Sequence, residues 1–447
     1  MGARSTPLLR GMLTTGLIGF GGGSALIPII EREVVEKRDL LTPEMYTRHV
    51  VVANMTPGAL PVKLAAFAGH ATRGAGLALL AALTVAAPGT LATLGLLAAS
   101  DALGPGATQV IRHASVGIAA FIIVLLVGYI LTVHRRAGRH RGAFVVITLL
   151  SALATGADSI LRVIGTLAGR PIEFDLPSLS AVQLILLSLL LIGVYSLWQR
   201  GRHPGRDTSV ALPHVRADRT DGRVRSQAGR AWMTTLVFVA VALAGVGLFA
   251  IVGGADGARL GGLLGASAAS SFGGGEAYVG IAEGFFVRQG HIGRDEFFTQ
   301  LVPIANALPG PILLKVGAGI GFISGAATGG ASAWLLGIAG MLVTLGMTCA
   351  IATPVLAAFE SLRHVPFVVN VARFILPVIC GLLIHVSASM LDVSAEVAAD
   401  AGLSGQAVLW VSLAAIAGMT VLHVRRMVPD LAMLLVCGAV SLAVLGW

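Results

Sequence analysis

The sequence predicts an all-α membrane protein with about 13 transmembrane helices, built as two homologous halves that form an inverted repeat with broken helices. Of the 447 residues, 55% are hydrophobic and only 12% are charged, and the mean hydropathy is +0.86. Apolar stretches recur along the whole chain, each long enough to cross about 30 Å of hydrocarbon as a helix. Residues 20–69 also align without a gap with residues 272–321. These observations exclude a water-soluble globular protein.

The predicted spans are helices, because the strands of a membrane barrel would be about half as long and would alternate polar with apolar residues. Arg4 and Arg10 flank the first run without a small-residue cleavage site, so we expect this run to remain as the first span. The spans begin near residues 10, 50, 75, 107, 142, 177, 231, 258, 297, 327, 367, 405 and 429.

The net charge of +9 comes from basic residues in the connections between spans, which argues against a nucleic-acid partner and fits the positive-inside rule. With a cytoplasmic N-terminus, the even-numbered connections carry the basic clusters. The largest, residues 199–230, has eight arginines against three aspartates and is predicted to be a cytoplasmic linker. It would join an N-terminal half, 1–198, to a C-terminal half, 231–447. The connection with Asp392, Glu396 and Asp400 is expected on the outer face.

The repeat relates the two halves by an offset of 252 residues. It opens in the first predicted span and again in the eighth, and an odd number of crossings lies between them, so the copies are expected to run in opposite directions. Inverted repeats are typical of secondary transporters, in which two similar units rock about a shared site. The repeat therefore favours a carrier over a pore.

Both copies contain a glycine run and a Pro-Gly step inside apolar sequence. Such breaks persist in membranes where the freed backbone lines a cavity, and the N-termini of the resulting short helices attract anions. Close packing of helices through small residues is the alternative. Within segments 2 and 9 the Pro-Gly breaks also permit re-entrant loops, although the charge pattern favours crossing segments. The candidate backbone residues are Gly21, Gly22, Gly23, Pro57 and Gly58 in the first copy and Gly273, Gly274, Gly275, Pro309 and Gly310 in the second.

Lys63 and Lys315 occupy one repeat position, and they are two of only three lysines in the chain. An ammonium inside an apolar segment needs a counter-ion, a carboxylate or a hydrated cavity, so we expect both to face an anion. Snorkelling to an interface is the alternative. Asn54 and Asn306 are also paired by the repeat, and their amides either donate to an oxyanion or bridge helices.

Three glutamates are candidates for coupling or gating. Glu31 and Glu283 are equivalent in the repeat and lie about two helical turns beyond the glycine runs. Desolvated carboxylates of this kind can carry a proton, although pairing with Arg32 or Arg288 is an equal alternative. Glu276 directly follows the second glycine run, where the first copy has Ser24.

Motifs for enzymes and ATP-driven pumps are missing, since the sequence has no GxxxxGK[ST], HExxH or GxSxG stretch. The three cysteines lie singly in apolar segments, without the spacing of a metal site. We therefore expect no catalytic residues, no cofactor and no metal. The expected partners are an oxyanion substrate and the lipid bilayer, and a homodimer is one assembly that the sequence allows.

At these residues the chain resembles the chromate ion transporter family in its long form with two homologous halves. The matching residues are Phe20 to Gly23, Asn54, Pro57, Gly58 and Gly69, and then Phe272 to Gly275, Glu296, Phe297, Asn306, Pro309 to Pro311 and Gly321. Ala59 stands where the family usually has a second proline, and the two lysines stand where another polar residue is expected.

The resemblance implies secondary active transport of chromate outward across a bacterial inner membrane, and so chromate resistance, by an antiporter that uses a proton or anion gradient. A carrier for sulfate or another oxyanion, or an anion channel, is the alternative function.

Overall fold

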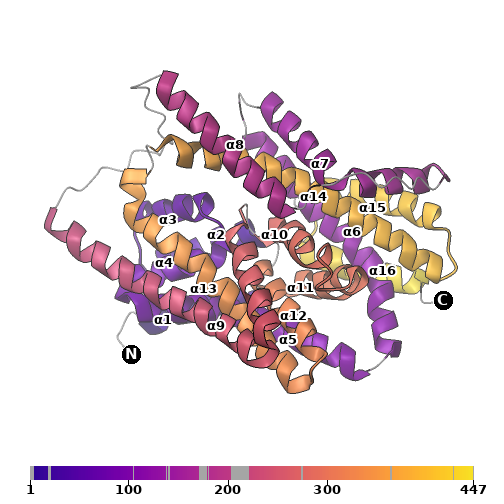
Figure 1. The fold of residues 1–447 in the computed structure, drawn as a ribbon. Helices are drawn as coiled ribbons and strands as arrows, with labels where there is room; N and C mark the ends of the chain where they lie inside the picture. The colour runs from indigo at the N-terminus through magenta and orange to yellow at the C-terminus, as the bar shows by residue number, and fades with distance from the viewer. Residues whose placement is uncertain are drawn as a thin grey trace. The chain divides into compact units, whose positions relative to one another are not determined.

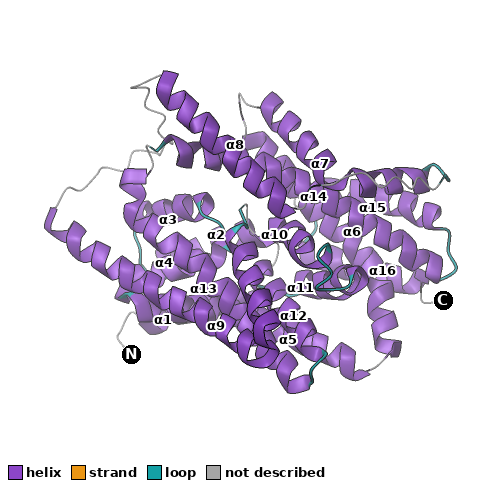
Figure 2. Ribbon diagram, in the orientation of Figure 1, coloured by secondary structure: helices purple, strands orange, loops and turns teal. Residues whose placement is uncertain are grey.

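A computed structural model describes residues 5–18, 22–103, 105–136, 138, 141–170, 179, 181–202, 221–272, 275–362, 365–425 and 427–445. In this part of the chain all regular structure is helical, as Figure 2 shows, which confirms the predicted all-α class. The α-helices are α1 (Ser5–Ile18), α2 (Gly22–Glu31), α3 (Pro43–Met55), α4 (Leu60–Arg73), α5 (Ala75–Leu103), α6 (Pro105–Arg136), α7 (Arg141–Leu167), α8 (Ala181–Arg202), α9 (Asp221–Ala269), α10 (Gly275–Ala282), α11 (Val302–Ala307), α12 (Ile312–Ala326), α13 (Gly330–Leu362), α14 (Pro366–Asp400), α15 (Gly405–Val424) and α16 (Asp430–Leu445). Three short π-helical turns are η1 (Arg32–Glu36), η3 (Glu283–Val287) and η4 (Glu296–Leu301).

Seven helices in the described ranges are long and apolar enough to cross a membrane, which supports a multi-pass membrane protein. They include all or most of α5, α6, α7, α13, α14 and α15 and residues 229–269 of α9. Four shorter apolar helices accompany them. The total of about 13 crossings and the inverted direction of the repeat stay predictions.

A predicted helix break lies at the second glycine run, where α9 ends at Ala269, residues 270–272 are not helical and α10 begins at Gly275. At the first run α1 ends at Ile18 and α2 begins at Gly22, and residues 19–21 lie outside the described residues. Helix α9 itself turns at Gly254, which has φ 59°. A Cβ on Gly257 would lie 2.1 Å from the carbonyl oxygen of Phe249, so the segments on either side of the turn fold back on each other. The spans predicted to begin near 231 and 258 are therefore the two arms of α9.

Segments 2 and 9 are each divided into short helices at their Pro-Gly steps. Helices α3, α4 and α12 have 13, 14 and 15 residues. At 1.5 Å per residue, a helix of this length reaches about 20 Å, which is less than the thickness of the hydrocarbon core. None of these three helices can therefore cross a bilayer alone.

The chain forms two compact units, and each takes segments from both sequence halves. Unit 1 consists of Met1–Leu91, Ile185–Gly275 and Pro309–Leu376. Within it, α13 packs along α9 and α12, as seen in Figure 1, and also contacts α3 and α4. Sequence similarity and spatial clustering thus divide the chain differently.

Unit 2 consists of Ala92–Leu184, Glu276–Leu308 and Pro377–Trp447. Its helix α6 packs against α15, α16, η4 and α11. Part of its core consists of Phe121, Met433 and Leu434.

The structure changes one assignment of a connection. Asp392, Glu396 and Asp400 belong to the 35-residue helix α14 and not to a loop. Only residues 401–404 separate α14 from α15. Of the predicted linker 199–230, the two ends continue α8 and α9, and residues 203–220 lie outside the described residues.

Candidate functional site

The two Pro-Gly breaks have the same backbone geometry. Helix α3 ends in the extended residue Thr56 (φ −103°, ψ 150°), and α11 ends in Leu308 (φ −105°, ψ 150°). Gly58 has φ 101° and Gly310 has φ 96°, a region that is open to glycine and strained for other residues. The repeat is therefore present in the backbone as well as in the sequence at these two steps.

Lys63 lies at the first break with its ammonium group fully enclosed. Its side chain is only 1% exposed. Nζ donates to the carbonyl oxygens of Ala53 at 2.5 Å, Thr56 at 2.7 Å and Pro57 at 3.3 Å. The carbonyl groups at a helix C-terminus lack helical partners, so this cation satisfies the end of α3 and holds a positive charge at the break. The side chain does not extend to the protein surface, as snorkelling would require.

Lys315 is buried to the same degree, at 1% exposure. Its side chain passes beside Gly89 of α5, where Cδ would be 3.4 Å from an added Cβ. Both paired lysines therefore lie inside the protein, as their place in apolar segments implies.

Each Pro-Gly break packs against helices of the opposite sequence half, inside unit 1. Gly58 donates its N–H to the carbonyl oxygen of Ser271, at 2.6 Å, and faces Thr348 of α13. The carbonyl oxygen of Pro309 would be only 2.0 Å from a Cβ on Gly89, so α5 needs glycine at this crossing. The two breaks and the two lysines are thus gathered in one compact unit.

Two buried hydroxyl groups lie at the first break and are unused by the described residues. Ser271 and Thr348 are both 0% exposed, and neither side-chain oxygen has a hydrogen-bond partner there. Most buried polar atoms are paired, so unpaired hydroxyls beside a broken helix mark a place where a ligand or water would be bound. Sequence reasoning missed both, because Ser271 and Thr348 lie outside the aligned repeat, 272–321, and so have no counterpart that would single them out.

The remaining predicted backbone residues and amides are only partly brought together. Gly21, Gly273 and Gly274 lie outside the described residues, whereas Gly22 and Gly23 form the first turn of α2 and Gly275 begins α10. The amide of Asn54 donates to Val50 at 2.7 Å, and that of Asn306 donates to Val302 at 2.9 Å. Both amides therefore donate within their own segments, and Asn306 belongs to unit 2.

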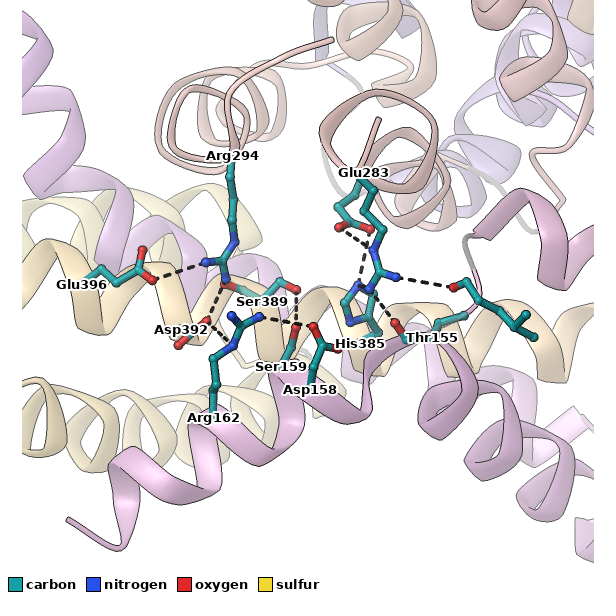
Figure 3. A network of polar contacts seen from close by, with 12 residues as sticks. Thr155, Asp158, Ser159, Arg162, Glu283, Arg294, His385, Ser389, Asp392 and Glu396 are labelled. Carbon is teal, nitrogen blue, oxygen red and sulfur yellow. Dashed lines mark hydrogen bonds and ion pairs between the residues drawn. The ribbon is translucent and has the colours of Figure 1, made fainter. Parts of the chain in front are cut away.

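The three glutamates are placed differently. Glu31 is the partly exposed last residue of α2, in unit 1, while Glu276 lies in the first turn of α10, in unit 2. Glu283 is 6% exposed and pairs with Arg288, whose Nε is 3.2 Å from Oε1. The arginine partner considered from the sequence is therefore present for Glu283. A histidine, His385 of α14, adds a second contact at 3.3 Å (Figure 3).

A second ionic cluster in unit 2 connects α7, α14 and the helical residue Arg294 just before η4 (Figure 3). Arg294 contacts Asp392 at 2.9 Å and Glu396 at 3.3 Å. Arg162 contacts Asp392 at 3.4 Å and Asp158 at 3.3 Å. The carboxylates that the charge pattern placed in an outer loop are thus paired with arginines along a helix. An ionisable residue inside an apolar helix, such as His385, was a signal for this region.

Comparison with known proteins places the chain among transporters. A family model described as "Chromate transporter" matches residues 6–170 and 258–442, which together are well over half of the chain. The chain belongs to the chromate transporter family. The two matched regions begin 252 residues apart, the same offset as the repeat, so this family member carries the family unit twice. The resemblance predicted from Phe20 to Gly23, Pro57, Gly58 and their counterparts is confirmed.

Two relatives from Bacillus subtilis (strain 168) are similar to parts of this chromate transporter family member. "Uncharacterized transporter YwrB" is 33% identical over 117 residues, which are 26% of this chain and 58% of the relative. "Uncharacterized transporter YwrA" is 32% identical over 90 residues, which are 20% of this chain and 51% of the relative. The chain thus spans just over half the length of each relative. No solved structure matches it.

Proposed function

We propose that this member of the chromate transporter family is a secondary active transporter that exports chromate across the bacterial inner membrane. The observation that carries the proposal is the pair of equivalent Pro-Gly breaks in unit 1, each followed by a buried lysine. Family membership supplies the class of substrate, an ion. The transporter works without a catalytic residue or a cofactor.

The first break offers the chemistry that a tetrahedral dianion needs. The 14-residue helix α4 begins at Leu60 with the positive end of its dipole, and the N–H groups of Leu60 and Val62 lie in its first turn, where an α-helix offers them no acceptor. Thr348 adds an O–H donor beside Gly58, and Ser271, whose carbonyl oxygen accepts from the N–H of Gly58, has a second buried hydroxyl without a partner among the described residues. Because Lys63 is fixed by three carbonyl groups, it contributes positive potential and not a direct ligand contact in this conformation. The substrate-binding residues of the proposal are therefore the breaks, the two lysines and these hydroxyls.

Alternating access would come from the inverted repeat. In this proposal the N-terminus is cytoplasmic, the halves 1–198 and 231–447 run in opposite directions, and the basic segment 199–230 joins them in the cytoplasm. The two breaks then approach the substrate from opposite sides of the bilayer. In unit 1 each Pro-Gly break packs against segments of the other sequence half, and this packing supports a shared site.

Flux into vesicles tests the proposal. The full-length protein, reconstituted into proteoliposomes, is expected to give saturable chromate uptake that is accelerated by chromate or sulfate on the opposite side. Competition with sulfate, phosphate and nitrate then ranks the substrates, and tighter competition by sulfate than by unlabelled chromate would identify a sulfate carrier. Anion current that does not saturate and needs no substrate on the other side would contradict a carrier and identify a channel.

A further inference from the structure

His385 and Glu283, which face each other in Figure 3, form one hydrogen-bonded group with Arg288 inside unit 2. His385 is 2% exposed and Glu283 is 6% exposed. Nε2 of His385 lies 2.8 Å from Nη2 of Arg288 and 3.3 Å from Oε2 of Glu283. Arg288 also closes the group by contacting Oε1 of Glu283 at 3.2 Å.

This group has two arrangements of its hydrogens, and neither satisfies both contacts of the imidazole. A guanidinium only donates and a carboxylate only accepts. A bare Nε2 accepts from Arg288 but presents its lone pair to Glu283. A protonated Nε2 donates to Glu283 but faces an N–H group of Arg288. A proton added to Glu283 allows its carboxyl O–H to donate to Nε2, and Arg288 then turns fully to its other acceptors.

One of those other acceptors lies at a kink in α7. Gly156 has non-helical angles of φ −142° and ψ 22°. Arg288 donates to the carbonyl oxygen of Thr155, the residue before the kink, and to that of Leu179 at 3.4 Å. Arg288 thus contacts both the carboxylate of Glu283 and the carbonyl oxygen of Thr155 at the kink of α7. The charge of Glu283 therefore determines which of these two contacts is the stronger.

The other imidazole nitrogen also faces the kink. Nδ1 of His385 is buried without a hydrogen-bond partner among the described residues. A Cβ on Gly156 would lie 2.2 Å from Nδ1, so the ring fits only because position 156 is glycine. The charged groups nearby on α7 and α14 are Asp158, Arg162 and Asp392, and they pair with one another.

We propose that Glu283, His385 and Arg288 form the site that binds the coupling proton of the transport cycle. The proposal rests on the proposed function, because it concerns what drives the oxyanion. A proton from water on one side resides on the Glu283–His385 pair, shifts Arg288 toward the kink of α7, and leaves to water on the other side. In this proposal Glu283 and His385 together hold the proton, and Arg288 responds to it by moving toward the kink of α7.

The experiment separates proton-driven flux from proton-independent exchange in proteoliposomes. Chromate flux is measured with an imposed pH gradient, and exchange of labelled for unlabelled chromate is measured at equal pH on both sides. Glu283→Gln and His385→Gln are expected to lower pH-driven flux by about tenfold or more, while exchange stays within about twofold of wild type. Asp400→Asn is the control, since Asp400 is exposed and pairs with Arg112 in another part of unit 2, and it is expected to keep both activities.

The outcomes distinguish the two proposals. The proton site alone is overturned if both variants keep the pH-driven flux of the wild-type protein. It is also overturned if the wild-type protein exchanges chromate but its net flux does not depend on the pH gradient. Absence of wild-type flux in both modes overturns the proposed function and the proton site with it.

A measurement on the wild-type protein covers the case in which both variants fail to fold. Chromate binding in weakly buffered detergent solution is expected to change the number of bound protons by about one, by the reciprocity of linked binding. No change in bound protons overturns the proposal.

Discussion

Thr348 of α13 stands directly against Gly58, so closely that its hydroxyl oxygen would be 2.5 Å from a Cβ on the glycine. This contact joins the Pro-Gly break of the first sequence half to the long helix of the second. Because Gly58 also has φ 101°, the position excludes other residues by both backbone angle and space. The close contact between Gly58 and α13 therefore requires glycine at position 58.

Gly58→Ala is expected to destabilise the protein by about 1–3 kcal/mol or more, since the substitution adds both strain and a clash. Thermal unfolding in detergent measures this loss. Thr348→Ala in the same chain is expected to restore only some of the loss from the clash, because Cβ of residue 348 would still lie 2.8 Å from the added atom. Gly76→Ala in α5 is the matched control, because nothing lies within 4 Å of its Cβ position, and it should leave stability unchanged or slightly higher. Equal stability of the Gly58→Ala and Gly76→Ala variants would contradict the close contact between Gly58 and Thr348.

Lys63→Ala and Lys315→Ala are expected to abolish chromate flux in proteoliposomes, because each removes a buried positive charge at a break. Lys63→Ala also leaves three carbonyl oxygens at the end of α3 without their donor. Size-exclusion elution and helical content of the variants should confirm that they remain folded. Unchanged flux in both folded variants would rule out a role of the lysines in transport.

Ser271→Ala and Thr348→Val test the unpaired hydroxyls. Neither hydroxyl has a partner in the described structure, so stability should change little, whereas the KM for chromate should rise about threefold to tenfold for each lost hydrogen bond. Thr344→Val is the control on the same helix, because its hydroxyl already donates to Gly340 at 2.8 Å. A KM that rises equally in the control would assign the effect to packing.

The sequence predicted the features that depend on local pattern. The second glycine run and the two Pro-Gly steps break helices at the predicted places, and the repeat offset recurs in the backbone angles of Gly58 and Gly310. Lys63 and Lys315 were correctly expected inside apolar segments. These features follow from residue types with strong backbone or solvation preferences.

Features that depend on distant contacts were not predictable in the same way. Hydropathy cannot show that Arg162 and Arg294 neutralise Asp392, so the carboxylates of α14 were assigned to a loop. Similarly, serine and threonine are ordinary residues in apolar sequence, and only the fold brings Ser271 and Thr348 to Gly58. Two consecutive short helices, such as α3 and α4, resemble one long span in composition, so hydropathy alone does not separate the two cases.

Gly156→Ala is a test of the proton site that leaves its three ionisable residues unchanged. The added Cβ would lie 2.2 Å from Nδ1 and 2.6 Å from Cβ of His385, so the whole side chain must shift and its contacts with Glu283 and Arg288 change. We expect chromate flux driven by a pH gradient to fall by about tenfold, while exchange at equal pH continues. Gly142→Ala, in the same helix with nothing within 4 Å of the added atom, should match wild type in both measurements. If Gly156→Ala retained full pH-driven flux, the position of His385 would not matter for coupling. The contacts among Glu283, His385 and Arg288 would then be only structural.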